Sequence, residues 1–351
     1  MAERILVTGG AGFIGRHVVA RLVEGGHRVR VLDNFNEQVH GAEPVRHPLL
    51  GDAEVVAGDV RDPDAVSAAL EGVDSVVHLA AEVGVGQSLY EIERYTDTNE
   101  RGTAVLFEAL AGRPVRRVVT ASSMSVYGEG LYRDAAGRPV ETASRGRPRA
   151  GSAWDPAGPD GAALVPEPTP EWKRCDLASV YALNKFAQER MTLIVAPAYG
   201  IEAVALRLFN VYGPGQSLSN PYTGVLAIFA GRILNGEPPL IFEDGEQRRD
   251  FVNVADVSDA FAAALFADGA SGRTINVASG ESRSVRSVAA DLARVMGRPD
   301  LSGEITGKTR TGDIRHCFAD VSLAAEVLGF RARVPFKTGL AALAEWVAGE
   351  T

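Results

Sequence analysis

Short apolar runs alternate with amphipathic stretches along most of the chain. The first run, at residues 5–7, leads into a glycine-rich segment and then into a stretch with valines and leucines at helical spacing. Branched apolar runs suit strands buried on both faces, and the stretches between them suit crossover helices. The pattern therefore predicts an α/β fold, a doubly wound parallel sheet. We expect further strands at residues 29–33, 54–58, 76–81, 117–121, 203–209 and 274–278, and helices at residues 100–111 and 181–196.

Two stretches break this alternation, at residues 213–249 and 280–351. They are more polar and are punctuated by Gly and Pro, so we expect them to fold together as a smaller second domain. Residues 1–212 and 250–279 would then form the first domain, with an insertion at about residues 131–174. A chain of 351 residues is long enough for two such cores.

The glycine-rich segment lies between the first strand and the first helix. Glycines permit a tight turn and let backbone N–H groups approach a pyrophosphate, and the helix start adds the positive end of its dipole. Asp33 ends the second strand, where its carboxylate can accept bonds from ribose hydroxyls and would repel a 2′-phosphate. The segment therefore predicts an NAD site rather than an NADP site. We expect NAD contacts from Gly9, Gly12, Phe13, Ile14, Gly15, Asp33, Asn34, Asp59, Val60, Leu79, Ala80 and Ala81, and also from Tyr181 and Lys185.

Tyr181 and Lys185 are four residues apart in a stretch with helical periodicity, which places both side chains on one face. A free tyrosine has a pKa of about 10, too high for a base at neutral pH, and a nearby cation lowers that pKa. The pair is a candidate acid/base group that takes a proton from a hydroxyl and returns it. The same spacing is typical of an amphipathic helix with a core Tyr and an exposed Lys, so the NAD site is what favours the catalytic interpretation.

A run of serines follows the strand expected at residues 117–121. The carboxyl end of a central strand is where open α/β sheets place their ligands. A hydroxyl there can donate to and accept from a substrate hydroxyl beside the Tyr181 phenol. We take Ser123 as the catalytic candidate, with Ser122 and Ser125 as neighbours that could be confused with it. Capping of the strand end is the alternative.

Composition narrows the class of protein. The formal charge of −9 argues against a nucleic-acid or anionic-membrane surface, and no apolar stretch reaches the length of a membrane span. Only Cys175 and Cys317 are present, so we expect no disulfide framework and a reducing cytoplasmic setting. The chain enters a strand at once, with no leader pattern. We also expect no metal site, because the insertion lacks paired cysteines.

Together, the glycine turn, Asp33, Ser123 and the Tyr181–Lys185 pair resemble the extended short-chain dehydrogenase/reductases. Within them the chain is similar to NAD-dependent nucleotide-sugar epimerases and dehydratases. The resemblance implies a Rossmann-like cofactor domain and a smaller mixed α/β C-terminal substrate domain. It implies that Tyr181 is the base, that Lys185 lowers the phenol pKa and binds the nicotinamide ribose, and that Ser123 positions the sugar hydroxyl. A homodimer is expected through the helices at residues 100–111 and 181–196.

Three later segments extend the resemblance, at residues 206–214, 249–256 and 310–315. They imply that a nucleotide-diphosphate sugar is the substrate. Guanidinium groups bind phosphate oxygens bidentately. A protein with a net negative charge needs such groups close to the site to hold a diphosphate. Asn253 stands where the family usually has His. The residues assigned to the substrate are Ser123, Asn210, Arg249 and Arg310.

The resemblance leaves the reaction to be chosen. A 4,6-dehydratase or decarboxylase of this family usually has an acid just after the catalytic hydroxyl residue, where Met124 and Ser125 stand here. Neither protonates a leaving hydroxyl as Glu does. We therefore expect a 4-epimerase. The alternatives are a nucleotide-sugar dehydratase, a reductase, an epimerase at another carbon, and a silent NAD-binding protein; the intact Ser123, Tyr181 and Lys185 argue against the last.

The insertion at about residues 131–174 departs from ordinary 4-epimerases. It is rich in Gly, Pro, Ala and Arg and includes residues 145–149, Trp154 and Trp172. A long, weakly patterned segment beside an active site is often a lid or a flexible loop, which could shape the sugar pocket or reach a second subunit. A disordered surface excursion is the alternative.

Overall fold

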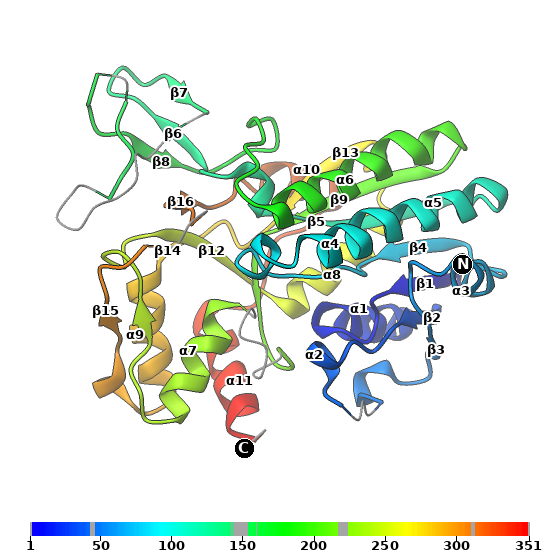
Figure 1. Ribbon diagram of the computed structural model, residues 1–351, viewed down its shortest axis with the longest axis horizontal. Helices are drawn as coiled ribbons and strands as arrows, with labels where there is room; N and C mark the ends of the chain where they lie inside the picture. The colour runs from blue at the N-terminus through cyan, green and yellow to red at the C-terminus, as the bar shows by residue number, and fades with distance from the viewer. Residues whose placement is uncertain are drawn as a thin grey trace.

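A seven-stranded parallel sheet forms one lobe of the molecule, seen on the right in Figure 1. The computed structural model describes residues 2–42, 46–141, 143, 154–158, 160–216, 224–309 and 313–349. The strand order is β13-β9-β5-β4-β1-β2-β3, and every neighbouring pair is parallel. These strands are β1 (Arg4–Thr8), β2 (Arg28–Asp33), β3 (Glu54–Ala57), β4 (Ser75–His78), β5 (Arg117–Ser123), β9 (Glu202–Leu208) and β13 (Arg273–Val277).

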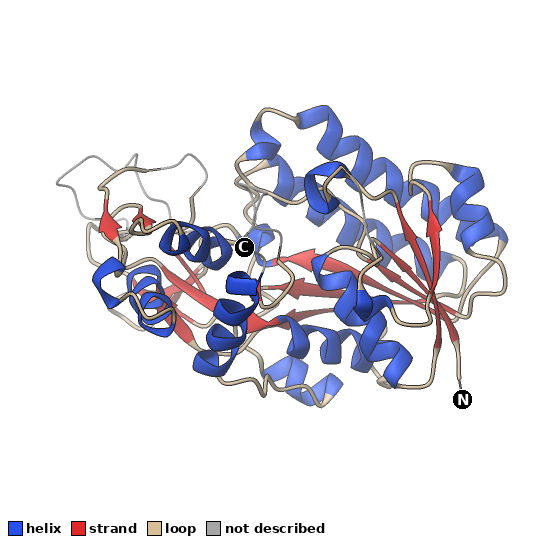
Figure 2. Cartoon of the chain, turned by 90° about the horizontal axis from the view of Figure 1, so that it is seen from below, coloured by secondary structure: helices blue, strands red, loops and turns tan. Residues whose placement is uncertain are grey.

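Helices cover both faces of this sheet, as Figure 2 shows. Side chains alternate across a strand, so Ile5 and Val7 pack under α1 and α8, whereas Leu6 packs under α3, α5 and α6. The expected helix at residues 100–111 is part of a longer helical run, because α4 and a π-helical turn at Asp97–Arg101 precede it. The helices of this lobe are α1 (Phe13–Glu24), α2 (Glu37–His40), α3 (Pro63–Ala69), α4 (Ile92–Thr96), α5 (Gly102–Gly112), α6 (Val180–Ala198), α8 (Val254–Phe266) and α10 (Ser322–Leu328).

A smaller second lobe mixes short strands and helices, at the lower left of Figure 1. Its core joins apolar side chains of α7, α9 and α11, among them Phe229, Leu292 and Leu340. The fold class predicted from the sequence, a Rossmann-like sheet with a smaller mixed α/β domain, is confirmed. The elements are β10 (Asn210–Tyr212), β11 (Leu240–Ile241), β12 (Arg248–Asn253), β14 (Ser282–Ser284), β15 (Glu304–Ile305), β16 (His316–Cys317), α7 (Val225–Leu234), α9 (Val285–Val295) and α11 (Phe336–Gly349).

The border between the two lobes crosses two strands. β10 and β12 pair with each other, and β14 and β16 pair with β12, all outside the seven-stranded sheet. Residues 210–212 and 250–253 therefore belong to the second sheet, although the sequence pattern placed them with the first domain. The division into 1–212 plus 250–279 and 213–249 plus 280–351 stays a proposal.

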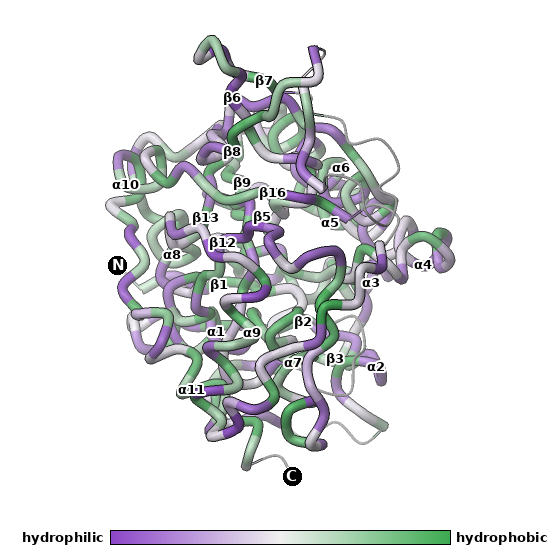
Figure 3. Tube along the Cα trace, turned by 90° about the vertical axis from the view of Figure 1, so that its left-hand side faces the viewer, coloured by the Kyte–Doolittle hydropathy of each residue, from purple (hydrophilic) through white to green (hydrophobic). Residues whose placement is uncertain are grey.

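The insertion forms a small antiparallel sheet of its own, which projects at the top of Figure 3. Its strands are β6 (Leu131–Arg133), β7 (Pro139–Val140) and β8 (Val165–Glu167), in the order β7-β6-β8. Tyr132 and Leu164 give it a local apolar core, and the Thr169 amide donates to the Phe318 carbonyl of the second lobe at 2.7 Å. A disordered excursion is therefore wrong for the described part; residues 142, 144–153 and 159 lie outside it.

None of the described helices combines the length and apolar character needed to span a bilayer.

Candidate active site

A cavity of about 540 Å³ opens at the carboxyl ends of β1, β4 and β5 and extends to the second lobe. Parallel strands end at one edge of a sheet, which is why motifs far apart in sequence meet there. Asp59 is absent from the lining and Arg310 lies outside the described residues. The other predicted site residues line this one cavity: Gly9, Gly12, Phe13, Ile14, Gly15, Asp33, Asn34, Val60, Leu79, Ala80, Ala81, Ser123, Tyr181, Lys185, Asn210 and Arg249.

The glycine turn closes because its glycines lack side chains. Gly9 has φ +67°, a conformation that L side chains rarely adopt. A Cβ on Gly15 would lie 2.2 Å from the Gly9 carbonyl oxygen, too close for any side chain. Gly12 is the N-cap of α1 and brings no side-chain cap. The turn therefore presents backbone N–H groups and the positive helix end to the cavity, as a pyrophosphate requires.

Asp33 is held in place at the end of β2. Its carboxylate accepts hydrogen bonds from the backbone N–H groups of Ala11, at 2.9 Å, and Phe35, at 3.0 Å. His40, which the sequence pattern did not single out, lies 3.5 Å from Asp33 and lines the same part of the cavity. A fixed carboxylate at this point fits the ribose hydroxyls of an adenosine.

Asp59 has a different environment from the one expected. Its carboxylate accepts hydrogen bonds from the Arg61 guanidinium and from the Asn34 amide. The bonds from Arg61, partly offset by burial, lower the pKa of the Asp59 carboxyl to about 2. Asp59 thus accepts a hydrogen bond from Asn34, which lines the cavity. Of Asp59 and Val60, only Val60 lines the cavity itself.

Ser123, Tyr181 and Lys185 line the same cavity. Ser123 ends β5, and the other two residues lie on the first turns of α6. Burial raises the pKa of the Tyr181 phenol, and a hydrogen bond with Ser123 opposes that rise. The Lys185 ammonium donates to the Gln188 side-chain carbonyl at 2.7 Å. The serine and the phenol are therefore placed to share one substrate hydroxyl.

Burial sets the direction of the pKa shifts of this pair. Burial raises the pKa of Tyr181 more than the Ser123 hydrogen bond lowers it, and the lowering by Lys185 that the sequence predicted stays a prediction. Burial also lowers the pKa of Lys185 to about 7. Both shifts have one cause, since a low-dielectric site disfavours each charged form. Spacing along a helix predicts that the two groups are adjacent but not how deeply they are buried.

The end of the cavity nearest the second lobe carries Asn210 and Arg249. The Asn210 amide donates to the Asp250 carbonyl at 3.0 Å. The Arg249 guanidinium donates to the carbonyls of Ile314 and Arg315 and lies 3.9 Å from the Asp313 carboxylate. Arg249 is thus oriented by the segment that follows residue 312.

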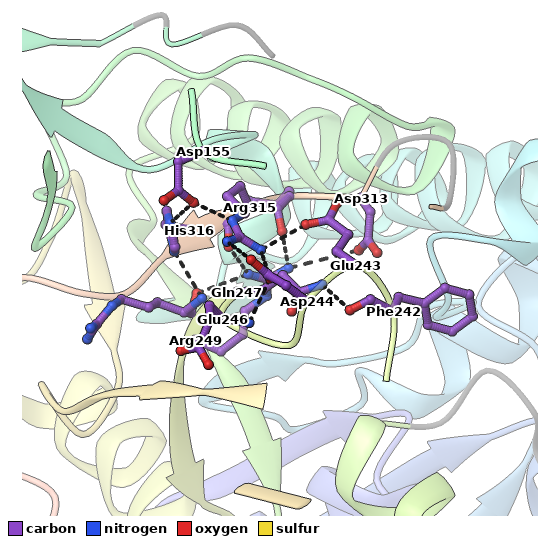
Figure 4. A network of polar contacts seen from close by, with 12 residues as sticks. Asp155, Phe242, Glu243, Asp244, Glu246, Gln247, Arg249, Asp313, Arg315 and His316 are labelled. Atoms are coloured by element: carbon purple, nitrogen blue, oxygen red, sulfur yellow. Dashed lines mark hydrogen bonds and ion pairs between the residues drawn. The ribbon is translucent and has the colours of Figure 1, made fainter. Parts of the chain in front are cut away.

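Arg315 anchors that segment to the insertion, as Figure 4 shows. Its side chain is 2% exposed and donates to Asp155 of the insertion at 2.6 Å and to Glu243 and Asp244 of the second lobe. Asp155 also bonds His316 at 3.1 Å. We did not single out Arg315 from the sequence. The sequence signal for it was an Arg-His pair inside an apolar run. Such a run predicts burial, and buried charges need partners.

The serine-rich turn holds no acid. Met124 and Ser125 both line the cavity, and Ser125 is 7% exposed. Among the described lining residues the carboxylates are Asp33, Glu82 and Asp313, none of them on this turn. Within the described part of the chain, no group of three or more His, Cys, Asp or Glu side chains is arranged for a metal ion.

Comparison with known proteins agrees with this geometry. The family model described as "NAD dependent epimerase/dehydratase family" matches residues 5–153 and 156–278. A dTDP-L-rhamnose 4-epimerase of Burkholderia thailandensis is 37% identical over 360 residues, covering 99% of this chain and 96% of the relative. The UDP-glucose 4-epimerase of Thermotoga maritima, solved with UDP-glucose, superposes with a TM-score of 0.81 at 29% identity and covers 99% of both chains. The Thermus thermophilus UDP-glucose 4-epimerase, solved with NAD, superposes with a TM-score of 0.79 at 29% identity and covers 99% of this chain and all of that one. The chain therefore belongs to the NAD-dependent epimerase/dehydratase family.

Proposed function

We propose that the protein is an NAD-dependent nucleotide-sugar 4-epimerase. It oxidises the sugar at C4, allows the 4-keto-sugar to rotate in the site, and then reduces the ketone on its opposite face. The observation that carries the proposal is the single cavity that joins the nucleotide turn to Ser123, Tyr181 and Lys185 and has no acid at Met124 or Ser125. The dTDP-L-rhamnose and UDP-glucose 4-epimerases among its relatives support the same reaction class.

NAD, when bound, supplies the hydride acceptor. Tyr181 takes the proton of the C4 hydroxyl as the phenolate and returns it as the phenol. Ser123 bonds the same hydroxyl and keeps it beside the phenol. The Lys185 ammonium stabilises the phenolate, which burial otherwise disfavours. Asn210 and Arg249 hold the substrate diphosphate, and Arg310 is proposed to add a second guanidinium.

The proposal is tested with purified protein and a panel of sugars. Denatured protein is expected to release NAD, and UDP-, GDP- and dTDP-hexoses are then followed by NMR. An epimer at C4 without added NADH is the expected product. A stable 4-keto product without epimer would instead identify a dehydratase, and consumption of added NADH would identify a reductase. Inversion of configuration at a carbon other than C4 would be visible in the same NMR spectra.

Gly15→Ala is expected to reduce the NAD carried by the purified protein at least tenfold. The added Cβ would lie 2.2 Å from the Gly9 carbonyl oxygen, so the turn has to open and its N–H groups leave their positions. The measurement is the NAD released on denaturation per mole of protein. Gly112→Ala is the matched control, because nothing lies within 4 Å of its Cβ position. Equal NAD content in Gly15→Ala and wild type would contradict the proposed turn.

Asp155→Ala is expected to raise KM for the nucleotide sugar about fivefold and to leave kcat nearly unchanged. The change removes a charge-assisted bond from Arg315, whose carbonyl orients Arg249, and such bonds contribute about 1 kcal/mol when partly exposed. Steady-state kinetics provide the measurement. Asp134→Ala removes a carboxylate of the same insertion that pairs with Arg138 instead of Arg315, and it serves as the control. A fall in kcat alone would count against this link.

We also propose a homodimer that packs α5 and α6 against the same helices of a second copy. Support comes from large apolar side chains exposed on this side, including Leu183 and Ile194 of α6, which are 49% and 60% exposed. Sedimentation velocity tests it. We place the enzyme in the cytoplasm, in keeping with the free thiols of Cys175 and Cys317.

A further inference from the structure

Gln188 lies on α6 one turn after Lys185 and is 1% exposed. Its carbonyl oxygen accepts a hydrogen bond from the Lys185 ammonium at 2.7 Å. Lys185 is itself 3% exposed, so its charge has little access to water. An ammonium in such a site keeps its proton only where nearby groups replace the lost hydration. Gln188 is one such group.

The other end of the Gln188 amide is fixed by two acceptors. Its nitrogen donates to the Thr103 hydroxyl at 3.0 Å and to the Ala80 carbonyl at 3.4 Å, and it lies 3.3 Å from Nε2 of His78. Burial lowers the pKa of His78 to about 3, so this ring is neutral, and its Nε2 also lies 3.0 Å from the Thr103 hydroxyl. A flipped amide would turn its nitrogen toward the ammonium and its oxygen toward the Ala80 carbonyl and the Thr103 oxygen, whose proton is already donated to Asn99. The network therefore selects the orientation in which the oxygen faces Lys185.

We propose that Gln188 is a positioning residue that keeps the Lys185 ammonium charged and in register with the Tyr181 phenol. The charge matters because the pKa of Lys185 is lowered by burial to about 7, an effect that Glu189 opposes. Other titratable groups facing it are His78 of β4 and Tyr181 of its own helix. Ala80 lines the cofactor cavity, so the same amide also ties Lys185 to the strand end that forms the cavity wall. The role in catalysis rests on the proposed function of Lys185.

The first test measures Lys185 directly. The chain has four lysines, so protein labelled at lysine 13Cε gives a small set of signals, and Lys185→Met assigns the relevant one. Gln188→Met removes the acceptor at similar length and is expected to lower the pKa of Lys185 by about 1, because bonds to charged groups are worth about 1.4 kcal/mol or more. Gln188→Glu provides a charged acceptor and is expected to raise it by about 1. Titration of Lys185 at an unchanged pH in both variants would overturn the proposal.

The second test follows the pH dependence of kcat. If the charged ammonium is required, the alkaline limb moves to lower pH in Gln188→Met and to higher pH in Gln188→Glu. A merely structural role would lower activity in both variants without moving the limb in opposite directions, and that result would contradict the proposal. Thr192→Val is the matched control, since Thr192 is a buried residue one turn further along α6 that bonds Thr120. A wild-type protein with no epimerase activity would refute the proposed function but leave the lysine titration interpretable.

Discussion

Tyr181→Phe is expected to lower kcat for nucleotide-sugar epimerisation by about 10²–10⁴-fold, the usual contribution of a positioned acid/base group. The phenyl ring keeps the packing, and the backbone N–H of residue 181 still donates to Ser88, so the fold is expected to stay intact. Only the hydroxyl shared with Ser123 is lost. The measurement combines NMR turnover with circular dichroism and the NAD content of the purified protein.

A control for this substitution is available on the same helix. Tyr199 is the C-cap of α6 and is 48% exposed, so Tyr199→Phe is expected to keep kcat within twofold of wild type. Retention of full activity by Tyr181→Phe would refute the acid/base role. A variant that lost its NAD as well would point instead to a structural contribution of the phenol.

The placement of the candidate catalytic groups was largely predictable from the sequence. The glycine turn follows β1, Ala80 and Ala81 follow β4, and Ser123 ends β5. In a parallel sheet all these positions lie at one edge, so the order of strands alone brings them to one cavity. The helical spacing of Tyr181 and Lys185 then sets two side chains on one face. Each step uses a local pattern whose geometry is regular.

Depth of burial was not predictable in the same way. Burial raises the pKa of Tyr181 and lowers that of Lys185. The orientation of Gln188 depends on Thr103 and Ala80, which are more than 80 residues away in sequence. The periodicity of α6 predicts neither the burial of these groups nor the orientation of Gln188, because both depend on tertiary packing.

The insertion was the least predictable region. Its strands are two or three residues long, too short for an alternation of apolar and polar positions to identify them. Asp155 and Arg315 are 160 residues apart and their contact follows from no local motif. The pairing of β10 with β12 was missed for a similar reason, since β10 directly follows β9 and β12 directly precedes α8, which both belong to the first lobe.

Arg207→Met is expected to destabilise the folded protein by about 3–5 kcal/mol, the usual effect of removing one partner of a buried ion pair. Arg207 and Glu189 are 5% and 1% exposed, and the guanidinium donates to both carboxylate oxygens, at 2.7 and 3.0 Å. Ser122 also donates to Glu189. The pair therefore joins α6 to β9 and to the end of β5, directly behind Ser123. Urea unfolding followed by circular dichroism is the measurement.

The double variant Arg207→Met/Glu189→Leu separates the ion pair from the rest of the site. Removing both charges leaves no unpaired ion, so most of the lost stability should return. Activity should not return with it. Burial lowers the pKa of Lys185 and the Glu189 carboxylate opposes that shift, so without the carboxylate the ammonium loses its proton at lower pH. A double variant that is stable and as active as wild type at neutral pH would show that Lys185 does not depend on this charge.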